Sequence, residues 1–113
     1  MSYIYNNVEV VRILDGDTID VFIDVGFRFK TIQRLRLLDY DAPERRQPGD
    51  EEACDKLQQL LAAGPITLQT MKNDGFGRWL SYISVDSADV NATMAAWLKE
   101  ASLLSPRLWI SCQ

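Results

Sequence analysis

The chain has 113 residues, of which 47% are hydrophobic and 25% charged, with a formal net charge of -4. These values predict one globular domain over residues 1–113 that buries its own core, and the acidic balance disfavours strong non-specific binding to nucleic acid. Because the sequence contains no histidine, it excludes a Ser-His-Asp or Cys-His triad and requires any metal ion to be held by oxygen atoms, which favours hard cations such as Ca²⁺.

Three strands are predicted in the first third of the chain. Residues 8–14 are rich in β-branched side chains, and an Asp-Gly turn at residues 15–17 joins them to the cleanly alternating residues 18–25. After a glycine turn, residues 27–38 form the third strand. Along it, two leucines share one face and two arginines share the opposite face: Leu35 and Leu37, Arg34 and Arg36.

The rest of the chain alternates between helix and strand. Helical spacing of apolar residues begins after Asp50 and ends at Gly64. Two further strands are predicted at residues 66–71 and 79–85, and a second helix at residues 90–102. The order β-β-β-α-β-β-α predicts a mainly β fold, namely a five-stranded OB-type Greek-key barrel with two flanking helices.

Charged residues gather at the ends of the strands. Between residues 28 and 46 there are six basic and three acidic side chains, which predicts a local basic face. Taken singly, Asp17 fits an ordinary turn aspartate, Asp41 and Glu44 fit a polar loop, and Arg36 fits a snorkelling arginine at a barrel rim. Their combination, rather than any one residue, points to a site.

Three separated segments carry this combination: residues 15–18 (DGDT), 36–44 (RLLDYDAPE) and 76–83 (FGRWLSYI). In this order they resemble the thermonuclease family, the staphylococcal-nuclease-like domains. Val90-Asn91, at the start of the second predicted helix, matches a further feature of that family, and the resemblance covers residues 8–103. The first segment is a weak signal by itself, and the specificity comes from the order of all three.

The resemblance implies a nuclease that hydrolyses phosphodiester bonds of DNA, RNA or both, with Ca²⁺ as cofactor. Carried over by position, Asp17 and Asp41 would hold the ion through their carboxylates and Ala42 through its backbone carbonyl. Ca²⁺ accepts oxygen ligands flexibly and can bridge a phosphate and a water molecule. We expect the protein to act as a monomer on its nucleic-acid substrate.

The same resemblance assigns the remaining catalytic roles. Glu44 would be the general base that activates the attacking water, and Arg36 and Arg78 would bind the scissile phosphate. Guanidinium groups match the oxygens of a phosphate with paired hydrogen bonds. Electrostatic positioning of this kind supplies much of the catalysis of phosphoryl transfer.

Some residues depart from the family pattern. Members often carry Lys-Tyr where this chain has Gly75 and Phe76, which predicts a weaker grip on a terminal phosphate. Phe76 could stack on a ligand or fill the core, and we expect it to lie in the core. With the acidic net charge, this difference keeps an alternative open: a non-catalytic OB-type module that binds nucleic acid or protein. A calcium-stabilised structural domain is a third interpretation.

The remaining expectations concern cellular context. Residues 1–7 have neither a basic nor an apolar run, and no apolar stretch is long enough to span a bilayer, so we expect a cytoplasmic protein without membrane contact. Two distant cysteines in such a chain predict free thiols, with Cys54 partly buried in the first helix and Cys112 in the tail. Trp109 is expected to cover exposed core.

Overall fold

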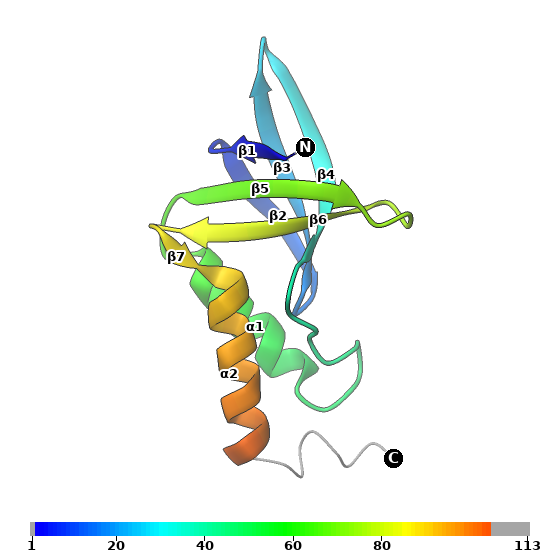
Figure 1. The fold of residues 1–113 in the computed structure, drawn as a ribbon, viewed down its shortest axis with the longest axis vertical. Coiled ribbons are helices and arrows are strands. Elements are labelled where there is room, and N and C mark those ends of the chain that lie inside the picture. The colour runs from blue at the N-terminus through cyan, green and yellow to red at the C-terminus, as the bar shows by residue number, and fades with distance from the viewer. Residues whose placement is uncertain (1, 105–113) are drawn as a thin grey trace.

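The computed structural model describes residues 2–104, which form a twisted sheet with two helices at one end (Figure 1). The elements in chain order are β1 (Tyr3–Tyr5), β2 (Val8–Asp15), β3 (Thr18–Gly26), β4 (Phe29–Leu37), α1 (Asp50–Leu61), β5 (Ile66–Asn73), β6 (Arg78–Val85), β7 (Ala88–Asp89) and α2 (Val90–Leu104). The mainly β fold with two helices is therefore confirmed, and the domain count stays a prediction.

The expected number of five strands is wrong, because residues 2–104 already form seven. The additional β1 pairs antiparallel with β5, where Tyr3 faces Thr70. The additional β7 follows a tight turn at Asp86 and Ser87, both with positive φ, and pairs with the end of β6. Both strands are too short to show the alternation of apolar and polar residues that identifies a strand in the sequence. Each is stabilised by pairing with a neighbouring strand.

The strand order is β1-β5-β6-β4-β3-β2, with β7 beside β6. Neighbours are antiparallel except for β4 and β6, which run parallel. Among the described strands, no backbone pairing joins β2 to β5, the pair that a closed barrel brings together. The OB-type barrel therefore stays a prediction.

The core lies between the inner sheet face and the helices. The alternating residues of β3 and β4 fill it as predicted, because side chains two apart on a strand share a face: Ile19, Val21, Ile23, Leu35 and Leu37 are all buried. Each helix buries a stripe of its surface, and Trp97 and Leu98 of α2 pack against the core. In the described part of the chain, no helix is both long and apolar enough to cross a membrane.

Phe76 does not lie in the core, and that expectation is wrong. It is 85% exposed at the tip of the turn between β5 and β6. Its neighbours Gly75 and Gly77 both have positive φ, and a tight turn of this kind directs its central side chain outward from the sheet.

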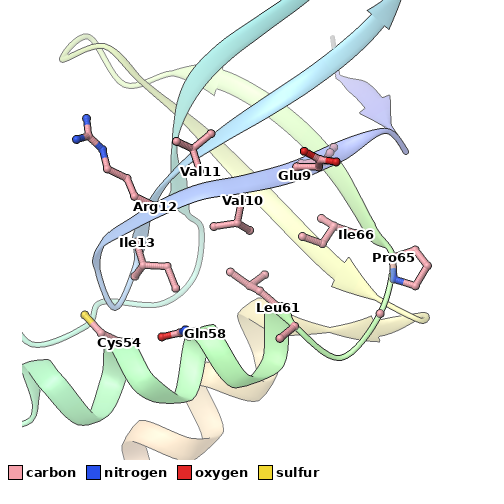
Figure 2. Close-up of a pocket in the computed structure, with 13 residues that line it drawn as sticks. Glu9, Val10, Val11, Arg12, Ile13, Cys54, Gln58, Leu61, Pro65 and Ile66 are labelled. Atoms are coloured by element: carbon pink, nitrogen blue, oxygen red, sulfur yellow. The ribbon is translucent and has the colours of Figure 1, made fainter.

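A cavity of about 640 Å³ separates β2 from α1 (Figure 2). Ile13 of β2 points toward α1, and Cys54 of α1 faces it from the helix. Cys54 is a half-buried free thiol, as expected, and burial together with the nearby Asp50 carboxylate raises its pKa to about 11. Cys112 and Trp109 lie outside the described residues.

Candidate active site

One cavity of about 560 Å³ collects the predicted site residues. They come from the β2–β3 turn, from β4 and the loop after it, and from the start of β6, and they include Asp17, Arg36, Asp41, Ala42, Glu44 and Arg78. Strand pairing accounts for this convergence. The antiparallel register places Thr18, next to Asp17, opposite Arg36, and the parallel register of β4 and β6 brings Arg78 to the same end of the sheet.

Asp17 is a buried carboxylate that fastens the β2–β3 turn to the loop after β4. Its Oδ1 accepts a hydrogen bond of 3.0 Å from the Thr18 hydroxyl, and its Oδ2 accepts one of 2.9 Å from the backbone N–H of Ala42. The backbone carbonyl of Asp17 also accepts a bond from the N–H of Leu37. The two segments that carry the predicted metal ligands are therefore joined by Asp17 itself.

Arg36 lies between the carboxylates of Asp17 and Asp41. Its Nη1 is 3.2 Å from Asp17 Oδ2, and its Nη2 donates to Asp41 Oδ1. Nη1 also donates to the backbone carbonyls of Leu37 and Tyr40, each at 2.7 Å. In this arrangement the guanidinium group organises the loop and offsets part of the charge of the two carboxylates, instead of pointing freely into the cavity.

Arg78 is held by Asp74, which lies in the turn between β5 and β6. Asp74 Oδ2 accepts a bond of 2.6 Å from Arg78 Nε, while its Oδ1 accepts from the N–H groups of Phe76 and Arg78. Burial alone would raise the pKa of Asp74, but these hydrogen bonds hold it below the ordinary value. An aspartate four positions before an arginine in a glycine-rich turn was the available signal.

Glu44 is the least constrained of the predicted residues. It is exposed and lines the cavity, and in residues 2–104 its carboxylate has no hydrogen-bond partner. Its backbone carbonyl accepts a bond from the N–H of Gln47, which fixes the turn that presents the side chain. A free carboxylate at the mouth of a polar cavity has the geometry to accept a proton from water.

Asp15 also lines this cavity, although its position suggested ordinary turn chemistry. Its Oδ1 is buried without a hydrogen bond, and the nearest cation is Arg45, at 4.0 Å. Burial, and then the charge of Asp17, raise the pKa of Asp15. A buried oxygen without a donor beside a second carboxylate is the kind of atom that a hard cation satisfies.

The donor set therefore fits Ca²⁺ by its chemistry, since carboxylate and carbonyl oxygens are the ligands that this ion takes. Its geometry is not that of a complete cage. Within residues 2–104, no three acidic or cysteine side chains are grouped so that they could hold one metal ion together. Arg36 occupies the position between the two carboxylates that were predicted as ligands.

Comparison with known proteins adds independent information. No family model matches the chain. It is 35% identical to an uncharacterized endonuclease of Escherichia coli O157:H7 over 104 aligned residues. The alignment covers 88% of this chain and 65% of that protein. It is 39% identical over 75 residues to the micrococcal nuclease of Shigella flexneri, covering 66% of this chain and 40% of the relative.

A third relative is endonuclease YncB of Bacillus subtilis strain 168, which is 32% identical over 97 residues, or 78% of this chain and 44% of that protein. The chain thus spans less than two thirds of the length of each of these relatives. These three relatives carry nuclease names, which agrees with the three sequence segments that converge on one cavity. The chain belongs to the thermonuclease family of staphylococcal-nuclease-like domains.

Proposed function

We propose that residues 1–113 form one OB-type domain that acts as a Ca²⁺-dependent nuclease on DNA, RNA or both. The observation that carries this proposal is the cavity in which carboxylates and guanidinium groups from three distant segments meet. The relatives named endonuclease and micrococcal nuclease support the same activity. Phosphodiester hydrolysis needs these groups, because it requires an activated water and neutralisation of a charged phosphate.

The charge of the cavity supports a requirement for a divalent cation. Four acidic and three basic side chains line it, so its formal charge is negative, and an anionic substrate would be repelled. A divalent cation held by Asp17, Asp41 and the Ala42 carbonyl would make the formal charge positive. When bound, Ca²⁺ would polarise the phosphate and favour ionisation of a water molecule.

The protein side chains then have separate tasks. Glu44 would accept the proton of the attacking water, because its carboxylate is exposed and unpaired in the described structure. Arg78, held by Asp74 at 2.6 Å, would bind a phosphate oxygen with its remaining guanidinium nitrogens. Arg36 would exchange its ion pair with Asp41 for the substrate phosphate while keeping its bonds to the loop carbonyls.

One observation favours a second candidate function, a non-catalytic nucleic-acid-binding module. The guanidinium group of Arg36 is already bonded to two carbonyls and paired with two carboxylates. If that arrangement persisted with substrate, Arg36 would be a structural residue and could not contribute to the reaction.

The test is cleavage of a fluorescent single-stranded DNA, and then of an RNA, in excess Ca²⁺ and in chelator. For Glu44→Gln we expect the rate to fall by about 10²-fold or more, while the matched control Glu100→Gln, an exposed residue of α2, keeps the wild-type rate. Equal rates for the two variants would overturn the role of Glu44. A folded wild type that retains both oligonucleotides uncleaved would establish the binding module instead.

A further inference from the structure

We infer that an arginine row, defined as Arg12, Arg34 and Arg78 with Asp20 between the first two, binds the phosphates of a single-stranded polynucleotide beyond the scissile bond. The inference rests on the proposed nuclease function and extends its substrate site across the sheet. It assigns Arg12 and Arg34, which do not line the 560 Å³ cavity of the candidate active site, to substrate binding.

The register of four strands places these residues in one line across the sheet. Arg12 of β2 faces Asp20 of β3, Asp20 faces Arg34 of β4, and Arg34 faces Arg78 of β6. Because neighbouring strands lie about 4.8 Å apart, three steps across the sheet give a row of roughly 14 Å. One end of this row is Arg78, which lines the catalytic cavity.

The row lies on the outer face of the sheet. Arg34 and Arg36 alternate with Leu35, which is fully buried in the core, so the two arginines share the face that is opposite the core. Figure 2 shows Arg12 on β2 pointing away from α1, whereas Ile13 points toward the helix. The side chains of Arg12 and Arg34 are 63% and 43% exposed, which leaves them accessible to a ligand.

Asp20 fixes both arginines without cancelling their charge. Its buried carboxylate accepts bonds from Arg34 Nε at 2.9 Å and Nη2 at 3.2 Å, and from Arg12 Nε at 2.8 Å. One negative charge is thus shared by two guanidinium groups. Within the described residues, the terminal nitrogens of Arg12 make no hydrogen bond to the protein, so they are available to phosphate oxygens, which guanidinium forks match well.

The chemistry of this row selects an extended polyanion. The whole chain has a net charge of -4, yet the three guanidinium groups of this row are paired with only two carboxylates, Asp20 and Asp74. The row is therefore locally positive, and it is continuous with a cavity proposed to bind phosphate. A strand that crosses the sheet from Arg78 toward Arg12 would place successive phosphates over successive guanidinium groups. A single strand fits better than a duplex, because only a flexible strand can follow the sheet and also enter the cavity.

The test uses binding and cleavage separately. Binding of a fluorescein-labelled oligothymidylate of about 16 nucleotides is measured by anisotropy in Ca²⁺ with the Glu44→Gln variant as background. Arg12→Gln and Arg34→Gln are compared with Lys30→Gln, a cation on the same face of β4 that lies roughly 13 Å from Arg34 along the strand. Thermal melts verify that each variant is folded. Arg12→Gln is the more conservative change, because Asp20 retains both bonds from Arg34.

We expect Arg12→Gln and Arg34→Gln to raise the Kd about three- to tenfold and to reduce the salt slope of log Kd by roughly one each. Lys30→Gln should change the Kd less than twofold. In the cleavage-competent background, Arg12→Gln should raise KM for the long oligonucleotide by a larger factor than KM for a dinucleotide, which is too short to reach Arg12 from the cavity.

Equal Kd values for Arg12→Gln, Arg34→Gln and Lys30→Gln would overturn the arginine row. A loss of affinity that appears only with a duplex of the same sequence would overturn the choice of a single strand. The nuclease proposal fails independently, through a folded wild type that leaves both DNA and RNA uncleaved in Ca²⁺, and that result leaves the comparison of binding intact.

Discussion

The side-chain amide of Asn91 donates a hydrogen bond of 2.8 Å to the backbone carbonyl of Leu38, 53 residues earlier in the chain. The same nitrogen donates to the carbonyl of Ser81 at 2.9 Å, and the amide oxygen accepts a bond from the N–H of Ile83. Leu38 is the residue after β4, directly before the loop that carries the proposed ligands. The first turn of α2 therefore fixes the base of the active-site loop to β6.

We predict that Asn91→Ala lowers the free energy of unfolding by about 2–4 kcal/mol, because the Ile83 N–H and the Leu38 and Ser81 carbonyls each lose a buried or partly buried hydrogen bond. Urea unfolding followed by circular dichroism measures this change. Asn6→Ala removes a bond between exposed side chains, Thr67 Oγ1 to Asn6 Oδ1, and should cost less than about 0.5 kcal/mol. Equal losses for both variants would show that the Asn91 amide is not a structural link.

We predict that lysine cannot replace Arg36. Arg36→Lys keeps the charge but loses the fork that bonds the carbonyls of Leu37 and Tyr40 and pairs with two carboxylates. We expect a loss of about 1–3 kcal/mol in unfolding free energy and at least a tenfold lower cleavage rate. The matched change Arg46→Lys, at an exposed loop residue, should alter neither quantity. If Arg36→Lys had the stability and cleavage rate of the wild type, only the positive charge of Arg36 would matter and not its guanidinium fork.

Gly16 is required by close packing between the active-site loop and α1. A Cβ at this position would lie 2.6 Å from Ala53 Cβ and 2.9 Å from Ala42 Cβ, so Gly16→Ala must displace the helix or the loop. We predict a destabilisation of about 1–3 kcal/mol, measured as a lower Tm, and a reduced cleavage rate.

Gly75→Ala is the control for this steric effect. Gly75 has a φ of 87°, and nothing lies within 4 Å of an added Cβ, so only backbone strain of about 1 kcal/mol is expected. That variant should keep its cleavage rate. A Gly16→Ala protein as stable and active as Gly75→Ala would mean that α1 and the loop adapt to the methyl group.

Most of the fold was predictable because its signals are local. The alternation in β3 and the helical spacing of α1 follow from burial on one face, and both elements are present. The position of Phe76 was not predictable from hydrophobicity, because the turn geometry of its two glycine neighbours outweighs the gain from burying one ring. The short strands β1 and β7 depend on pairing with distant residues, which a local pattern does not reveal.

The residues of the candidate site were predictable from the sequence, but the hydrogen bonds and ion pairs between them were not. The three sequence segments named the residues that converge on the cavity, whereas the link between Arg36 and the loop carbonyls depends on a backbone path that no spacing specifies. Asp74 and Asp15 looked like turn residues because their partners become apparent only in three dimensions. The arginine row was hidden for the same reason, since it is defined by register across four strands.

Asp20 should make the stability of this protein depend on acid pH. The hydrogen bond from Arg34, reinforced by Arg12 against the cost of burial, holds the pKa of Asp20 below its ordinary value of 3.8. A carboxyl whose pKa is lower in the folded state stabilises that state above its unfolded pKa, and this contribution disappears as the pH falls through the folded value. Asp20→Asn should therefore be less stable than wild type at neutral pH, by about 1–3 kcal/mol, and this difference in stability should shrink steadily as the pH falls below the ordinary pKa of an aspartate.

Urea unfolding over a pH series measures the difference in stability between Asp20→Asn and wild type, with the exposed Asp55→Asn as control. A difference that stays constant down to acid pH would mean that the two arginines do not bind Asp20 as an anion, and the positions of Arg12 and Arg34 in the arginine row would lose their anchor.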